Sequence, residues 1–127
     1  MSKPNKWQAL QQFWESFGIQ AYDENTVDFA NAQMPYITYE AETDSFDRVL
    51  TMSGSLWYRG TSWTAIDAKA DEISRALNEH GHWIMEIDGG YLWVNAGEPF
   101  ARRMIEPDDR NVRRIVLNIE AEFLAAY

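Results

Sequence analysis

Apolar residues recur at helical spacing in two segments of the chain. In the first, Lys6–Phe17, large apolar side chains stand three or four residues apart, which predicts a helix with one apolar face. Asn5 can cap the start of this helix, and Gly18 occupies a position at which helices commonly end. The apolar positions of the predicted face are Trp7, Leu10, Trp14 and Phe17.

The second helical segment is predicted from Ala65 to about Glu79. Thr64 and Asp67 fit a variant of the capping box, with Asp in place of the usual Glu, and Gly81 would close the helix. Apolar residues repeat here at 4-3-4 spacing, while most of the positions between them are polar. They are Ile66, Ala70, Ile73 and Leu77.

Alternation of apolar and polar residues predicts strands in the remaining segments. A short strand is compatible with Gln20–Tyr22, and the stretch YITYEAET after Pro35 indicates a half-buried strand. Val49–Arg59 predicts a further strand, in which Gly54 would mark a bulge or kink. The inner face of that strand would hold Leu50, Met52, Leu56 and Tyr58.

The C-terminal part of the chain predicts a hairpin and a last strand. HWIMEI and YLWVNA flank Asp88-Gly89-Gly90, which is typical of a hairpin turn. Gly97-Glu98-Pro99 is expected to break the chain before a short extended piece, Phe100–Ile105, and a turn at residues 106–109. Arg113–Leu124 alternates strictly, with an amphipathic helix over EAEFLAAY as the competing interpretation. Its apolar face would be Ile115, Leu117, Ile119, Ala121 and Phe123.

The summed order, α-β-β-α-β-β-(β)-β, predicts a single α+β domain over residues 1–127, with residues 1–5 disordered. Because tight turns join most of the strands, we expect one mainly antiparallel sheet with the two helices packed on one face.

Charge argues against two classes of partner. The 127 residues include 11 Lys and Arg against 20 Asp and Glu, which gives a formal net charge of −9. Such a surface repels phosphate backbones and anionic lipids, so we expect neither nonspecific nucleic-acid binding nor membrane binding. The N-terminal stretch lacks the apolar core of a signal peptide, and the chain has no cysteine, which suits the cytosol.

Patterns that carry catalysis or bind metals are weak. The sequence has neither a nucleophile motif nor a Gly-rich phosphate loop. His80 and His82 could share a face, but no third ligand stands at a matching spacing. The acidic groups at 23–28 and 40–47 leave acid–base or cation chemistry as the remaining route to an enzyme. We therefore expect no enzyme activity, no metal and no cofactor.

Positive charge is concentrated late in the chain. Five of the eight arginines fall between Arg102 and Arg114. They could dock an acidic neighbour, including an acidic face of another copy of this chain. They could equally be surface arginines that balance Glu106, Asp108 and Asp109, since exposed pairs contribute only about 0–1 kcal/mol.

Several short features occur in order between Leu56 and Phe123. They are Trp57-Tyr58-Arg59 at the end of a strand, Ser62-Trp63 before a helix with Ala70-Asp71 and Ile73, Pro99-Phe100, and Pro107-Asp108-Asp109 before a strand ending in Glu122-Phe123. This order, over a little more than half the chain, resembles small proteins of tailed bacteriophages. These are the tail terminator and minor capsid (head–tail joining) proteins of long, non-contractile tails.

The resemblance implies a subunit that assembles as a ring, commonly a hexamer, at the head-proximal end of the tail. Its partners would be other copies of itself, the tail tube and the head connector, and it would be made in the bacterial cytoplasm and end in the virion. DNA would pass without specific binding along an acidic wall, for which Glu40 and Glu42 are candidates. Candidates for the contact between subunits are Trp57, Arg59, Phe100, Arg102, Arg103 and Arg113.

Two other classes of function remain open. One is an acidic inhibitory protein, similar to an immunity protein, that captures a basic partner by charge steering. The other is a small-ligand carrier whose aromatic residues line a pocket between sheet and helix. An inhibitor should run as a monomer or dimer, whereas a terminator should form or join a ring.

Overall fold

The computed structural model describes residues 2–79 and 83–126, which form two helices and a six-stranded sheet. The sheet order is β1-β2-β3-β6-β5-β4; β1 and β2 are parallel, and all other neighbours are antiparallel. The predicted α+β class and mainly antiparallel sheet are confirmed. The elements are α1 (Lys6–Glu15), β1 (Gln20–Asp23), β2 (Tyr36–Tyr39), β3 (Val49–Arg59), α2 (Thr64–Asn78), β4 (Trp83–Ile87), β5 (Gly90–Met104) and β6 (Val112–Ala125).

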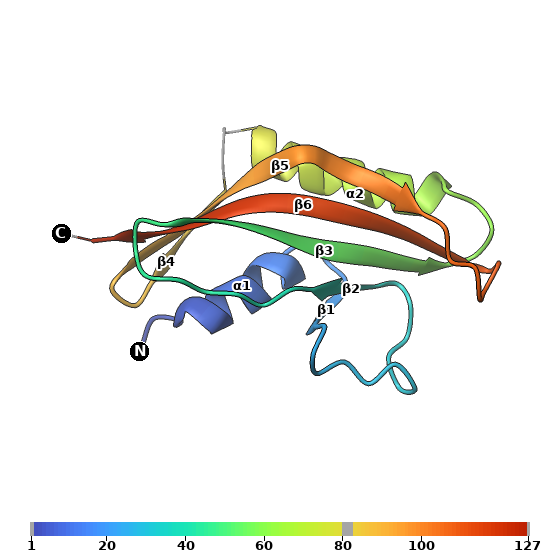
Figure 1. Ribbon diagram of the computed structural model, residues 1–127, viewed down its shortest axis with the longest axis horizontal. Coiled ribbons are helices and arrows are strands. Elements are labelled where there is room, and N and C mark those ends of the chain that lie inside the picture. Colours follow the sequence, from blue (N-terminus) through green and yellow to red (C-terminus); the bar gives the residue numbers. More distant parts are fainter. Residues whose placement is uncertain (1, 80–82, 127) are drawn as a thin grey trace.

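The helices do not form the simple layer that the sequence predicts. α2 packs against β3, β5 and β6, whereas α1 contacts β1 and β4, the two edges of the sheet. A flat six-stranded sheet would separate its outer strands by roughly 24 Å, more than one helix about 10–12 Å across can bridge. The sheet is therefore curled, and Figure 1 shows its long strands as bent ribbons with α2 behind them and α1 below.

The start of α1 is capped as predicted, and the predicted apolar positions Leu10, Trp14 and Phe17 are buried. The Asn5 side chain accepts from the Gln8 amide at 2.8 Å, and the Gln8 side chain accepts from the Asn5 amide at 2.9 Å. Trp7 is 54% exposed, contrary to the prediction. The missed residue is Phe13, whose ring packs edge-on against Trp83 at 5.0 Å between centroids.

The inner face of α2 is confirmed, because Ile66, Ala70, Ile73 and Leu77 are all buried. The predicted capping box is wrong. Trp63 is the N-cap residue and makes no side-chain cap, and Thr64 already lies in the helix. The Ser62 hydroxyl accepts from the Thr64 amide at 3.1 Å instead, while Asp67 points to Arg103 on β5.

The strands β3 and β6 show the predicted alternation of inward and outward residues. The competing helical interpretation of EAEFLAAY is wrong over residues 120–125, which belong to β6. Gly54 is not a bulge, because the pairing of β3 with both neighbours is continuous. It instead leaves room for the indole of Trp14. β2 is not half-buried: all four of its residues are buried, because aromatic side chains also cover its outer face.

The predicted break at residues 97–99 is a shift of register inside one long strand. β5 pairs with β6 on both sides of the shift, with Ala96 opposite Ile119 and Ala101 opposite Leu117. The Asn118 side chain donates to the Pro99 carbonyl at 2.8 Å within the shift. The observed order is thus α-β-β-β-α-β-β-β, because β1 is a strand and residues 100–104 continue β5.

The N-terminal residues follow the β4–β5 turn. The amide of Asp88 donates to the Pro4 carbonyl at 2.8 Å, and Lys3 pairs with Glu86 at 2.5 Å. Lys3 and Pro4 thus lie beside the β4–β5 turn, and Asn5 caps α1. One apolar cluster unites both helices with the inner face of the sheet.

Candidate functional site

The arginine cluster lies at one end of the long β5–β6 hairpin and is divided between two faces of the sheet. On the helix side, Trp63 has the guanidinium of Arg103 at 4.7 Å and that of Arg113 at 5.2 Å from its ring centre. Arg103 also pairs with Asp67, with Nη2 to Oδ2 at 2.5 Å, and Arg113 donates to the Thr61 carbonyl at 2.7 Å. Both guanidinium groups are thereby held by their own chain.

On the opposite face, Trp57 and Arg114 form a second stacked pair. The Arg114 guanidinium lies 4.8 Å from the Trp57 ring centre and pairs with Glu106 at 3.5 Å. The indole nitrogen of Trp57 donates to the Thr38 hydroxyl at 2.9 Å, and Arg114 Nε donates to the Ser55 hydroxyl at 3.1 Å. These contacts place Trp57 as a half-buried support for Arg114.

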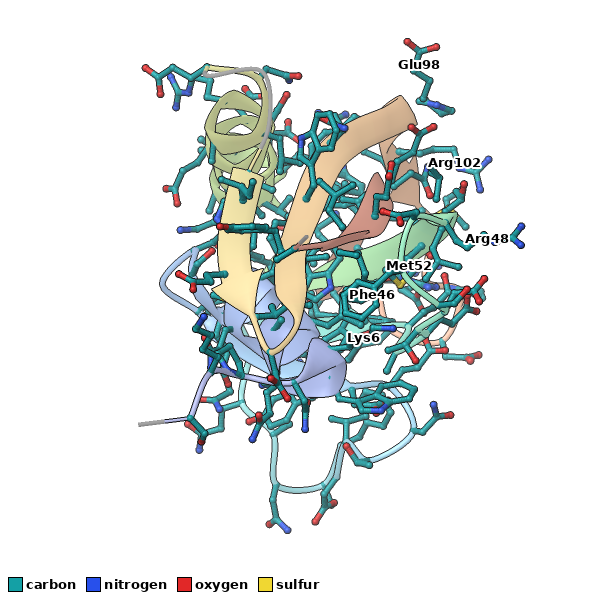
Figure 2. The ribbon with its side chains drawn as sticks, turned by 90° about the vertical axis from the view of Figure 1, so that its left-hand side faces the viewer. Lys6, Phe46, Arg48, Met52, Glu98 and Arg102 are labelled. Atoms are coloured by element: carbon teal, nitrogen blue, oxygen red, sulfur yellow. The ribbon has the colours of Figure 1, made fainter. Side chains whose placement is uncertain are left out.

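The remaining interface candidates differ in how much their own chain holds them. Arg59 is exposed and reaches Asp109 at 3.6 Å, and the half-buried Phe100 packs against the core. Arg102 projects from the face of the sheet opposite α2 (Figure 2). Within the described residues, the Arg102 side chain has neither an ion pair nor a hydrogen bond.

The two acidic candidates for a channel wall have different surroundings. The carboxylate of Glu40 accepts from the amide of Ser53 at 3.1 Å and from the Ser53 hydroxyl. Glu42 is exposed in the connection between β2 and β3. Glu42 is therefore the more available negative charge of the pair.

An apolar surface that the sequence did not indicate lies on the open face at the other end of the hairpin. The strand register places Ile84, Trp93, Glu122 and Val49 in one row across β4, β5, β6 and β3. Val49 is 61% exposed, Ile84 52% and Tyr91 40%. A hollow of about 170 Å³ opens here. Its lining consists of Val49, Trp93, Asn95, Glu120, Ala121 and Glu122.

Three features of these surfaces escaped prediction for identifiable reasons. The sequence places Trp63 directly before a helix, and no local pattern indicates that two arginines distant in the sequence stack on its ring. Ile105, 87% exposed, follows the end of β5, where its sequence neighbours show no regular pattern. The apolar residues of the row, Ile84, Trp93 and Val49, each lie on the face of their strand that the alternation would leave polar. Only the register between strands brings them together.

The other hollows differ in their lining, and one of about 370 Å³ is lined by Trp63, Met104, Ile105 and Val112 with Glu106, Arg110 and Arg113. The space between α2 and β5, about 280 Å³, is lined mainly by charged and small residues, including Asp67, Asp71 and Arg103. A groove of about 290 Å³ between the 29–36 segment and the β5–β6 turn has an aromatic floor with Tyr36 at its centre. Burial raises the pKa of that phenol, against an opposing effect of Arg59.

Comparison of the sequence with protein-family models and with curated proteins found no match. In the described ranges, 2–79 and 83–126, no group of three or more His, Asp or Glu side chains is arranged to hold a metal ion. His80, Gly81 and His82 lie outside these ranges. Neither helix that the structure describes is long and apolar enough to cross a membrane.

Proposed function

We propose that the protein is a structural subunit of a bacteriophage tail. It is the tail terminator or head–tail joining subunit of a long, non-contractile tail, and it assembles as a ring at the head-proximal end. The order of features between Leu56 and Phe123 supports the phage assignment by resemblance. The arrangement of the arginines supports self-assembly on physical grounds.

The observation that carries the proposal is the unequal state of the arginines at one end of the hairpin. Arg103, Arg113 and Arg114 are fixed by contacts within the chain. Arg102 and Arg110 are exposed, and in the described residues their guanidinium groups have no partner. The chain has 20 carboxylates, so another copy offers a complement for these free cations.

The net negative charge of the chain suits the passage of DNA through such a ring. Each phosphate contact adds affinity, so a channel wall without cations holds DNA weakly. Glu42, whose side chain is exposed, is the better candidate for that wall, because Ser53 already occupies the carboxylate of Glu40. The ring would meet the tail tube on one side and the head connector on the other.

Light scattering and electron microscopy of the purified protein across a range of concentrations test this function. We expect discrete rings, and we expect Arg102→Glu with Arg110→Glu to abolish them. Arg75→Glu is the matched control, because Arg75 is exposed on α2 and also has no side-chain partner among the described residues. A protein that stays monomeric at every concentration, and instead captures basic proteins, would support the inhibitor class.

A further inference from the structure

We propose that the acidic patch on the open face is the docking site for the arginine end of a second copy of this chain. The acidic patch consists of the apolar residues Val49, Ile84, Tyr91 and Trp93 and is named for the two carboxylates among them, Glu120 and Glu122. The arginine end is defined as Ile105 with Arg102 and Arg110. This inference rests on the proposed function and names the two surfaces that meet in the ring.

The acidic patch combines exposed apolar surface with free negative charge. Three of the six large hydrophobic side chains most exposed in the described residues belong to it, at Val49, Ile84 and Tyr91. Glu122 interrupts the row between Trp93 and Val49, and exposed apolar side chains gathered on one face in this way are typical of interaction sites. Its rim contains Glu120 and Glu122, and within the described residues neither carboxylate pairs with a cation.

The arginine end offers the complementary chemistry. Ile105, the most exposed of these hydrophobic residues at 87%, stands at the tip of the hairpin, after the end of β5. Arg110 lines the same hollow as Ile105, whereas Arg102 projects from the open face three residues before it. An apolar side chain with neighbouring cations matches a hollow whose rim is acidic, and such pairing gives a contact its specificity.

Arg102 cannot reach Glu122 of its own subunit. Arg102 lies opposite Val116, on the same face as Glu122 but six residues along β6. At strand spacing that separation is roughly 20 Å, beyond the combined reach of the two side chains. Arg102 and Glu122 are therefore not paired with each other within one subunit, and both remain open to water or to another molecule.

The positions of the two surfaces favour a head-to-tail contact. Figure 1 shows the β4–β5 turn and the C-terminal end of β6 at one end of the long axis, and the β5–β6 turn at the other. A contact between two different surfaces of one subunit repeats from copy to copy, and it closes into a ring when the rotation allows. A two-fold face-to-face dimer would stop at two copies.

Cysteine cross-linking tests the contact directly, because the chain has no cysteine of its own. The double variant Val49→Cys with Ile105→Cys should give a ladder of disulfide-linked multimers under mild oxidation. The control pairs Ile105→Cys with Trp7→Cys, since Trp7 is similarly exposed but lies on α1. It should give no ladder. Circular dichroism of each variant checks that it is folded.

The outcomes separate this inference from the proposed function. Rings in the microscope without a ladder from the Val49–Ile105 pair would overturn the contact and leave the ring. A ladder without closed rings would support the contact and count against the terminator function. A product that stops at the dimer, or an equal ladder from the control, overturns the head-to-tail contact.

Discussion

Gly54 lies against the indole ring of Trp14, where a Cβ atom would stand 2.8 Å from Cη2 and 3.0 Å from Cζ2. Since Trp14 is fully buried between α1 and the sheet, neither group can move aside easily. We expect Gly54→Ala to lower the free energy of unfolding by about 1–3 kcal/mol, as overpacking of a core usually does. Urea unfolding followed by tryptophan fluorescence measures the change.

A double-mutant cycle with Trp14→Phe provides the control. The smaller ring leaves space for the added methyl group, so Gly54→Ala should cost less in the Trp14→Phe background. Equal costs in both backgrounds would mean that the contact with Trp14 is not the cause.

The two helix starts give a matched pair of predictions. Asn5→Ala should destabilise the protein by about 0.5–2 kcal/mol, because it removes the side chain that accepts from the Gln8 amide. Thr64→Ala should change the stability less than Asn5→Ala does, because the Thr64 side chain caps no backbone amide and only accepts from the exposed Ser62 hydroxyl. Thermal unfolding of both variants compares them, and a large loss for Thr64→Ala would restore the cap that the sequence predicts.

The sequence predicts the elements whose pattern is long and regular. α2 and β6 both keep one apolar face over many residues, and their buried faces are the predicted ones. β1 has only four residues and pairs in parallel with β2, so its partner and direction have no local signal. Trp7 shows the limit for α1, since it stands at the same helical spacing as the buried Leu10, Trp14 and Phe17 and is nevertheless exposed.

The candidate site shows a second limit. Sequence alone groups the arginines, but it does not say which of them are free. The register shift opposite Asn118 decides this, because it turns Arg103 toward Asp67 on the helix side and Arg102 toward the open face. Likewise, the acidic patch exists only through pairing across four strands. The alternation within one strand assigns its two faces, but it does not identify the residue that stands opposite on the next strand.

Tyr39 makes the stability sensitive to alkaline pH. Burial, with the nearby Asp23 and Glu15, raises the pKa of Tyr39 to about 12 from 10.0. A pKa that is higher in the folded than in the unfolded protein favours folding below pH 10, and this contribution is lost as the pH rises toward 12. Burial raises the pKa values of Tyr36 and Tyr58 as well, so they act in the same direction.

We therefore expect the free energy of unfolding to fall between pH 10 and about 12. Tyr39→Phe should reduce that fall, although it also removes the hydrogen bond from the phenol to Gln11. Urea unfolding at several pH values measures the slope. Tyr91→Phe, at a more exposed position, is the control and should keep the wild-type slope; an unchanged slope in Tyr39→Phe would contradict the prediction.

Charge reversal provides the strongest test of how copies meet. A variant with Arg102→Glu and Arg110→Glu has an acidic end and an acidic patch, so its copies should repel one another. A variant with Glu120→Arg and Glu122→Arg has a basic end and a basic patch, and it should fail in the same way. Neither should assemble alone.

Mixing the two variants should restore assembly, because each then offers the complement of what the other presents. Copies of the two kinds must alternate around the ring, so closure requires an even number of subunits, as in a hexamer. Light scattering of the equimolar mixture should show a species larger than either variant alone gives, and it should dissociate at high salt as exposed charges are screened. If the mixture stays as small as its components, the arginine end and the acidic patch do not meet. Rings of odd number in the wild-type protein would predict open chains in the mixture instead of closed rings.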